Sequence, residues 1–187
     1  LMVPMLTSLK SWFISQPSAD HLADYAKSGD TRHLTKLVTL FGNDLYHYLV
    51  TQSNEQLAFD ISQQTWLKVM EKRHHYQPQA NPKAWLFRLA RNALIDEYRK
   101  QQRFVELEDS TVIAAKSTEQ PFDYDKFNEA LMQLSFVQRE ALSLQQEGFS
   151  LDDIQHITQS NHETVKTRLR YAKQNLKIIL GADNDQA

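Results

Sequence analysis

One side of a predicted helix within residues 81–103 carries side chains that suit nucleic acid. These side chains are Trp85, Arg88, Asn92 and Arg99. Guanidinium groups follow a phosphate backbone, aromatic rings stack on unpaired bases, and an amide can bond a base edge. The pattern favours binding of single-stranded nucleic acid. The alternative for the aromatic residues Trp85 and Phe87 is ordinary core packing at helical spacing.

A second basic segment lies near the C-terminus, in LDDIQHITQSNHETVKTRLRYAKQNLKIIL. A short helix that begins at Ser150 is followed by about four polar residues and a long helix from Asn161, which is helix-turn-helix spacing. Ser150 and Asn161 are both suited to cap the helices that follow them. Val165, Leu169, Ala172 and Leu176 form one apolar face, and the opposite face is polar and basic. Such a helix suits a DNA major groove, although a solvated basic face is also possible.

The elements that hold these segments are predicted to be helices throughout. Only four glycines and five prolines occur in 187 residues, and no alternating strand pattern is bounded by hairpin turns. We therefore predict an all-α protein of two small helical domains, the second a helix-turn-helix. The predicted helices span residues 19–28, 31–51, 55–73, 82–102, 123–133, 135–147, 150–157 and 161–180.

Charge divides the chain in the same way. Residues 81–103 and 158–180 each carry a net charge of +4, whereas residues 104–130 carry −5. We therefore place a flexible acidic linker between two basic domains. The predicted organisation is an N-terminal extension at 1–19, a first domain at 20–103, the linker at 104–122, a second domain at 123–182 and a tail at 183–187.

Composition excludes several classes of protein. The chain has no cysteine, which excludes disulfides and thiolate metal sites and favours the cytoplasm. No apolar run approaches the roughly 18 residues of a membrane span, so we expect no stable membrane insertion. A metal-dependent enzyme is a weak alternative, because its candidate ligands share no ligand motif: His74, His75, His156 and His162. We expect no catalytic residue, metal or cofactor.

Two stretches resemble the RNA polymerase sigma factors of the extracytoplasmic-function (ECF) group. DISQQTWLKVM (60–70) and AWLFRLARNALIDEYR (84–99) are similar to the family's second conserved region. LSFVQREALSL (134–144), GFSLDDI (148–154) and TVKTRLRYAKQNL (164–176) are similar to its fourth region. The resemblance covers about residues 22–180.

The resemblance implies a non-catalytic subunit that directs core RNA polymerase to promoters. The helix from about Glu55 would bind the clamp of the largest polymerase subunit, and the second domain would contact the flap of the second largest. The linker would thread through the polymerase. Polymerase contacts are expected at Phe59, Asp60, Gln63 and Trp66. Recognition and melting of the minus-ten element are expected at Tyr76, Trp85, Arg88, Asn92 and Arg99. Reading of the minus-35 element is expected at Glu163, Thr164, Lys166, Thr167, Arg168, Arg170 and Lys173.

This sequence departs from the family pattern at several positions. The acidic run that usually precedes the polymerase-contact helix is reduced to Asp60, preceded by Leu57, Ala58 and Phe59. Phe59 would supply apolar contact instead, or phosphorylation of Ser53, Ser62 or Thr65 would restore charge. Gln155 and Gln159 occupy helix-turn-helix positions where alanine and glycine are usual, which suggests a looser turn or an unusual promoter element.

The main rival interpretation is a two-domain transcription regulator that binds duplex DNA without polymerase and uses residues 20–103 for dimerisation or ligand sensing. Family resemblance favours an anti-sigma factor as a further partner, but no residue identifies it.

Overall fold

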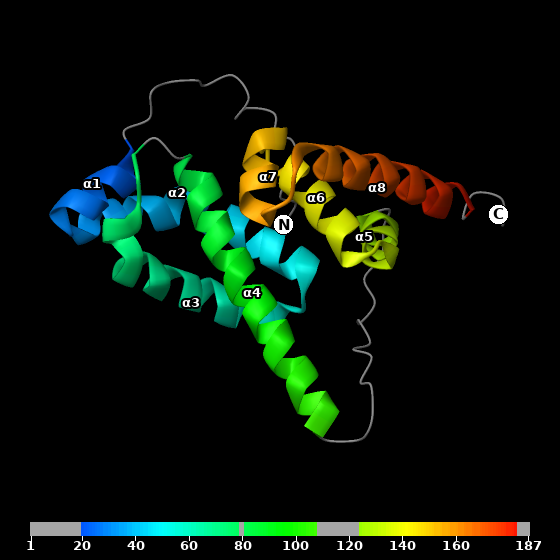
Figure 1. The fold of residues 1–187 in the computed structure, drawn as a ribbon, viewed down its shortest axis with the longest axis horizontal. Helices are drawn as coiled ribbons and strands as arrows, with labels where there is room; N and C mark the ends of the chain where they lie inside the picture. The colour runs from blue at the N-terminus through cyan, green and yellow to red at the C-terminus, as the bar shows by residue number, and fades with distance from the viewer. Residues whose placement is uncertain (1–19, 79–80, 108–123, 183–187) are drawn as a thin grey trace.

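The computed structural model describes residues 20–78, 81–107 and 124–182, and within these ranges every regular element is a helix (Figure 1). This confirms the all-α prediction. The predicted N-terminal extension, the C-terminal tail and linker residues 108–122 lie outside the described residues.

The first domain contains α1 (His21–Ser28), α2 (Thr31–Gln52), α3 (Glu55–Lys72), a short 3-10 turn η2 (Arg73–His75) and α4 (Pro82–Leu107). The second contains α5 (Tyr124–Gln133), α6 (Phe136–Gln146), α7 (Leu151–Thr158) and α8 (His162–Ala182). Most predicted bounds agree within two residues. Helix α4 is longer than predicted and continues from residue 102 to Leu107, because neither proline nor glycine interrupts it after Pro82.

Side-chain caps start most of these helices. Asp20 accepts hydrogen bonds from the amides of Leu22 and Ala23, and Asn54 accepts one from Leu57. Ser150 and Asp153 form a reciprocal capping box at α7, as the predicted cap required. Each cap satisfies amides that the first helical turn leaves unpaired, so it fixes where each helix begins.

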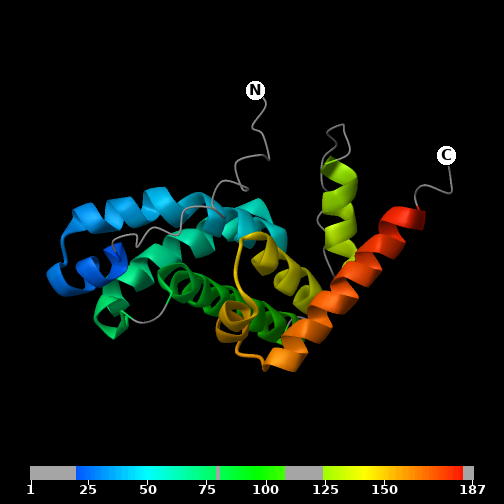
Figure 2. The ribbon, with the colours of Figure 1, turned by 90° about the horizontal axis from the view of Figure 1, so that it is seen from above.

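The two domains are packed against one another. In two perpendicular views, α7 lies beside the N-terminal half of α4, and α6 lies beside α2 (Figures 1 and 2). One continuous core contains Leu45 and Phe87 of the first domain together with Leu144 and Ile154 of the second. A smaller core joins α5, α6 and α8 through Leu131, Leu134, Leu142 and Ala172. The sequence predicted the two domains but did not reveal this contact.

Among the residues that the structure describes, no helix is both long enough and apolar enough to cross a membrane.

Candidate nucleic-acid and polymerase interfaces

The outward side of α3 exposes large apolar side chains. Phe59 is 52% exposed and Leu67 is 54% exposed, and Met70 is also exposed. At 3.6 residues per turn, these three residues and Gln63 lie within an arc of about 80° on the helix. We call this set, Phe59, Gln63, Leu67 and Met70, the α3 face. A contiguous exposed apolar strip is typical of a surface that binds another protein.

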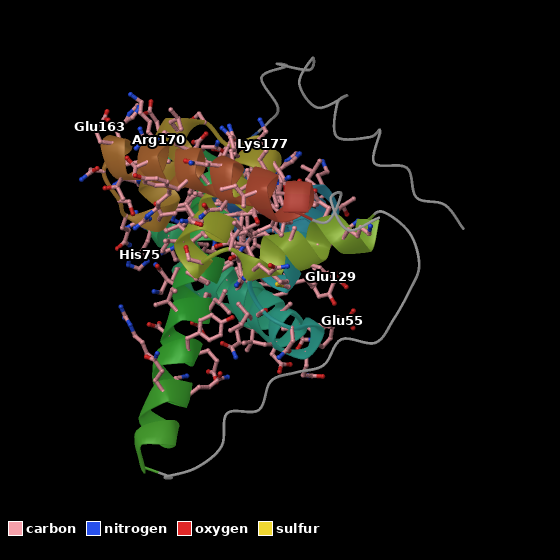
Figure 3. All side chains as sticks on the ribbon, turned by 90° about the vertical axis from the view of Figure 1, so that its right-hand side faces the viewer. Glu55, His75, Glu129, Glu163, Arg170 and Lys177 are labelled. Carbon is pink, nitrogen blue, oxygen red and sulfur yellow. The ribbon has the colours of Figure 1, made fainter. Side chains whose placement is uncertain are left out.

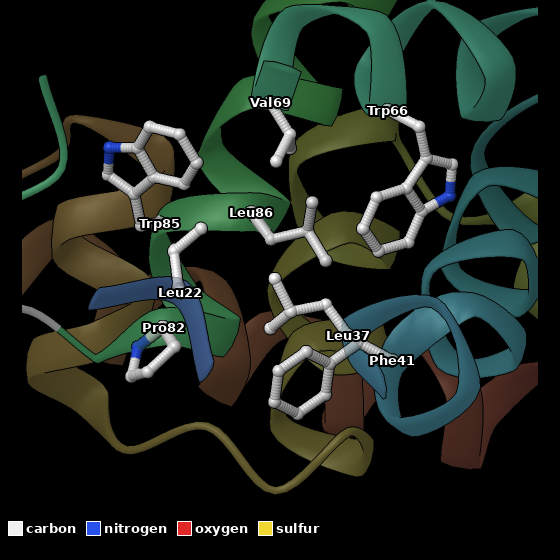
Figure 4. A pocket seen from close by; sticks show the side chains of 8 residues that line it. All are labelled: Leu22, Leu37, Phe41, Trp66, Val69, Pro82, Trp85 and Leu86. Carbon is white, nitrogen blue, oxygen red and sulfur yellow. The ribbon is translucent and has the colours of Figure 1, made fainter. Parts of the chain in front are cut away.

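The other two predicted polymerase contacts, Asp60 and Trp66, differ in exposure. Asp60 is exposed, and its carboxylate accepts a hydrogen bond from Gln56 Nε2 at 3.3 Å. Trp66 is half-buried, and its ring lines an apolar cavity of about 10 Å³ with Leu37 and Phe41 (Figure 4). The cavity is too small for a ligand, so Trp66 packs the first domain with at least part of its ring.

Two features of α3 correct or extend the sequence analysis. Thr65 is fully buried and donates a hydrogen bond to the carbonyl of Ile61, so a kinase cannot reach it in the folded chain. Leu67 and Met70 were missed as members of the α3 face. They could have been found from the sequence, because both are apolar and lie on the side of the helix opposite to the buried residues Ala58 and Ile61.

A basic hollow of about 380 Å³ lies between the end of α3 and the middle of α4. Its lining consists of Lys68, Lys72, Leu89, Arg91, Asn92, Ile95, Asp96, Arg99 and Gln159. The lining has four cationic side chains and one carboxylate, and because Arg91 is paired with Glu140, the other three cations remain for a polyanionic backbone. The structure therefore brings the predicted residues Asn92 and Arg99 together. It adds Lys68 and Lys72, which the sequence analysis overlooked because they lie on α3, before the basic segment 81–103.

The two aromatic residues predicted at the minus-ten site are packed against the protein. Tyr76 is 5% exposed, its hydroxyl donates to Asp20 Oδ2 at 2.7 Å, and burial raises its pKa. The ring of Trp85 meets the ring of Tyr76 edge to face at 5.5 Å, and Trp85 faces the same cavity as Leu22 (Figure 4). Base stacking by either ring therefore requires a rearrangement of this corner and stays a prediction.

Arg88 of α4 contacts the second domain. Its guanidinium Nη1 lies 3.1 Å from Nε2 of His156 on α7. Nearby, Asn81 donates to Asp153 Oδ1 at 3.2 Å. The side of α4 that is predicted to contact the minus-ten element is thus partly covered by the helix-turn-helix.

The most buried polar contact between the domains is centred on Glu140 of α6. Its side chain has 0% exposure, and its two oxygens accept hydrogen bonds from Arg91 Nε at 2.7 Å and Arg91 Nη2 at 3.2 Å. Tyr48 of α2 also donates to Glu140, at 3.1 Å, and burial next to this carboxylate raises the pKa of Tyr48. Glu140 was not singled out by the sequence analysis, because an isolated glutamate in a helix gives no sign of burial.

A second contact between the domains involves Lys83 at the start of α4. Its ammonium group lies 2.8 Å from Asp44 Oδ2 and 3.4 Å from Glu147 Oε2, and it donates to the carbonyl of Glu147 at 2.9 Å. It also lies over the rings of Phe87 and Phe149, which meet edge to face at 4.8 Å. Burial raises the pKa of Glu147. Both faces of this interface therefore combine apolar packing with paired charge.

Helix α8 presents a different surface. Of its predicted apolar side, Val165, Leu169 and Ala172 are buried, and Leu176 is half-buried. All seven residues predicted to read the minus-35 element are exposed or half-exposed: Glu163, Thr164, Lys166, Thr167, Arg168, Arg170 and Lys173. Figure 3 shows Glu163, Arg170 and Lys177 along the length of the helix. Arg168 is the most engaged of the set, because it donates to Ser160 Oγ at 2.7 Å.

The turn between α7 and α8 contains the family departure at Gln159. This residue adopts a left-handed conformation, with φ 53°, at the C-cap of α7. The predicted cap at Asn161 is present, since its side chain accepts from the amide of Thr164 at 2.8 Å. The turn therefore has the usual backbone shape without the glycine that best fits it.

The histidines proposed as ligands of a metal-dependent enzyme are not brought together. His74 and His75 lie in η2, His156 contacts Arg88, and His162 pairs with Asp152 at 3.7 Å. Within the ranges 20–78, 81–107 and 124–182, these four form no three-ligand cluster.

Comparison with known proteins identifies relatives of both sequence and fold. The model of sigma-70 region 2 matches residues 37–104. The ECF RNA polymerase sigma factor EcfG of Rhodopseudomonas palustris is 35% identical over 137 residues, which cover 70% of this chain and 75% of that protein. The ECF sigma factor SigM of Bacillus subtilis is 27% identical over 154 residues, which cover 78% of this chain and 94% of that protein.

Two solved structures share the fold. The sigma factor RpoE of Bartonella quintana, crystallised with the anti-sigma factor NepR, superposes with a TM-score of 0.74 and 29% identity, covering 82% of this chain and 99% of that chain. CnrH, in complex with the cytosolic domain of CnrY, superposes with a TM-score of 0.67 and 22% identity, covering 88% of this chain and 97% of that chain.

Proposed function

This chain belongs to the ECF RNA polymerase sigma factors, which direct promoter-specific initiation of transcription. From this premise, we propose which surface of the chain binds polymerase and which surfaces bind each promoter element. Residues 20–103 bind core polymerase and the minus-ten element, and residues 123–182 read the minus-35 element. The observation that carries this division is the match of the family model to residues 37–104, the segment that contains the α3 face and most of the basic hollow. As a non-catalytic polymerase subunit, the chain is not an enzyme.

The α3 face is the surface that binds the clamp of the largest polymerase subunit. Phe59 stands where relatives place a carboxylate, and it is exposed on the same arc as Leu67 and Met70. Apolar burial therefore replaces much of the electrostatic contribution at this surface. Gln63 supplies a polar contact within this face, and Asp60 supplies one at its edge.

The basic hollow is the path of the non-template strand at the minus-ten element. Lys68, Lys72 and Arg99 neutralise phosphates, and Asn92 lies among them with an amide that can bond a base edge. Unstacking a base costs a few kcal/mol, and contacts to the displaced strand offset that cost. Trp85 and Arg88 lie nearer the start of α4 than Asn92, Tyr76 packs on Trp85, and these three residues complete the site once this corner opens.

Helix α8 reads the minus-35 element in the major groove. Glu163, Thr167 and Arg170 lie on its outermost side, opposite to buried Val165 and Leu169. Lys166 and Lys173 flank this line and suit phosphate contacts. The second domain also contacts the flap of the second largest polymerase subunit.

The domains separate when the chain binds promoter DNA with polymerase. In the packed arrangement, α4 contacts α7 directly, with Arg88 and His156 only 3.1 Å apart. This contact covers part of the side of α4 that is predicted to bind the minus-ten element, so the packed form is the form without promoter.

The relatives RpoE and CnrH were solved with NepR and with the cytosolic domain of CnrY. By analogy with RpoE, we propose that an anti-sigma factor binds this chain and holds it away from polymerase. Its place of action is the cytoplasm, where polymerase and chromosome are.

Run-off transcription with core polymerase tests the proposal. The chain should support initiation at a host promoter, and a variant with Phe59→Ala and Leu67→Ala should not compete for core enzyme. Leu40→Ala, at a similarly exposed leucine on α2, is the matched control. Binding of the promoter by the chain alone, with no stimulation by polymerase, would support the rival regulator instead.

A further inference from the structure

Three potential metal ligands converge where α1 meets α2, away from the surfaces described above. His21 and Asp24 lie one turn apart on α1, and His33 lies in the first turn of α2. One ligand atom from each residue lies within 4.8 Å of the other two. The two imidazole rings are 5.7 Å apart, and His33 Nδ1 lies 3.9 Å from Asp24 Oδ2.

Both histidines keep a ring nitrogen without a hydrogen-bond partner. Nδ1 of His21 and Nδ1 of His33 are shielded from solvent, and neither makes a hydrogen bond to a residue that the structure describes. Buried polar atoms are hydrogen-bonded in the large majority of cases, so two buried ring nitrogens without a hydrogen bond, close to one carboxylate, need an explanation. A metal ion would use the lone pairs of both rings.

The local fold holds these three residues in place. Asp20 caps α1, and Gly29, with φ 68°, turns the chain so that α2 begins two residues later. The neighbouring cations are engaged elsewhere: Arg32 bonds Asp30 at 2.6 Å, and Arg73 donates to the carbonyls of Tyr25 and Ala26. Among the described residues, neither of these two guanidinium groups forms an ion pair with Asp24.

We propose that His21, Asp24 and His33 bind one divalent transition-metal ion, with zinc as the first candidate. Two imidazoles and one carboxylate form a donor set that zinc accepts, with a fourth position left for water. Tetrahedral bonds of about 2.0–2.1 Å place ligand atoms about 3.3 Å apart, so small side-chain rotations close the present spacing. The ion joins α1 to α2.

This site would affect the minus-ten corner through a short chain of contacts. Asp20, next to His21, accepts the hydrogen bond from Tyr76, and Arg73 ties the end of α3 to α1. A metal that fixes α1 therefore fixes the segment that leads into α4. In Figure 1, α1 lies at the opposite end of the molecule from α8, so minus-35 reading should not depend on the metal.

The test uses the full chain without an affinity tag, stripped with chelator and titrated with zinc chloride in a calorimeter. We expect one zinc per chain and a rise in melting temperature. Asp24→Asn and His33→Gln should each weaken binding at least about 10-fold. The double variant His74→Ala and His75→Ala is the control, because it removes two exposed histidines outside the cluster.

Circular dichroism verifies that each variant is folded, and cobalt substitution gives an independent spectroscopic readout. Visible absorption of four-coordinate cobalt should appear with the parent chain and disappear with Asp24→Asn. Absence of zinc binding, or binding that the cluster variants leave unchanged, would overturn the proposal. Loss of binding only in the His74 and His75 control would also overturn it.

Discussion

Helices α4 and α8 carry similar charge and similar periodicity, but they differ in what covers them. On α4, Arg88 contacts His156, Arg91 is paired with buried Glu140, and Lys83 lies among Asp44, Glu147 and two phenylalanine rings. On α8, the predicted reading side is exposed along its outer line. The predicted minus-35 surface is therefore available in the packed chain, whereas the second domain partly covers the predicted minus-ten surface.

The difference indicates where regulation acts. We expect polymerase and any anti-sigma factor that bind this chain to act on an equilibrium between packed and separated domains, because the domain contact covers part of α4 and leaves the predicted reading side of α8 exposed. The α3 face is exposed in the packed chain, so core polymerase can make its first contact before the domains separate.

The largest expected effect comes from Glu140→Ala. This change leaves Arg91 and Tyr48 without their shared buried partner, and breaking a buried pair in this way costs about 3–5 kcal/mol. We expect the packed form to be lost, which small-angle scattering would detect as a larger radius of gyration. Glu129→Ala, at an exposed glutamate on α5, should leave the radius unchanged.

A double variant sharpens this prediction. Replacing Arg91 with Met and Glu140 with Leu removes both charges, and such exchanges of buried pairs are often neutral or stabilising. The domains should then stay packed, with Tyr48 as the remaining unpaired group. An unchanged radius in Glu140→Ala would contradict the role that we assign to this carboxylate.

Substitutions on the exposed side of α8 should change the affinity for promoter DNA and leave the stability of the chain unchanged. Arg170→Ala should weaken holoenzyme binding to the minus-35 element by about 1–3 kcal/mol and relax its base preference, because arginine reads guanine through two bonds. Lys177→Ala, farther along α8, should mainly reduce the salt dependence of the affinity for promoter DNA. Filter binding at several salt concentrations measures both. An equal loss of affinity at all promoter sequences would mean that Arg170 contacts a phosphate and does not read a base.

The α3 face should affect polymerase binding alone. Phe59→Ala should lower affinity for core polymerase by about 1–2 kcal/mol, because an exposed ring becomes buried in the complex. Fluorescence anisotropy with labelled chain measures the affinity. Leu40→Ala serves as the control, and an equal loss there would show that the α3 face is not the contact surface.

The smallest effect concerns the turn of the helix-turn-helix. Gln159→Gly should raise the free energy of unfolding by about 0.5–1 kcal/mol, because glycine adopts the left-handed conformation without strain. Urea unfolding measures this value. A decrease would mean that the glutamine side chain, which borders the basic hollow, makes a contact that outweighs the strain.

The sequence predicted local structure well and interdomain structure poorly. Caps at Ser150 and Asn161 and the apolar side of α8 follow from neighbouring residues, so their signals lie within a few positions of one another. The partners of Glu140 lie 49 and 92 positions away, and nothing in the local pattern marks that glutamate as buried. Exposure of Leu67 and burial of Tyr76 likewise depend on helices far along the chain.

The most direct test measures the distance between the domains before and after holoenzyme assembly. The chain has no cysteine, so Thr39→Cys on α2 and Gln174→Cys on α8 give two unique sites for spin labels at exposed positions. Pulsed electron paramagnetic resonance should find one short, narrow distance distribution in the free chain and a much longer one with core polymerase and promoter DNA. The same short distance in both states would contradict the account.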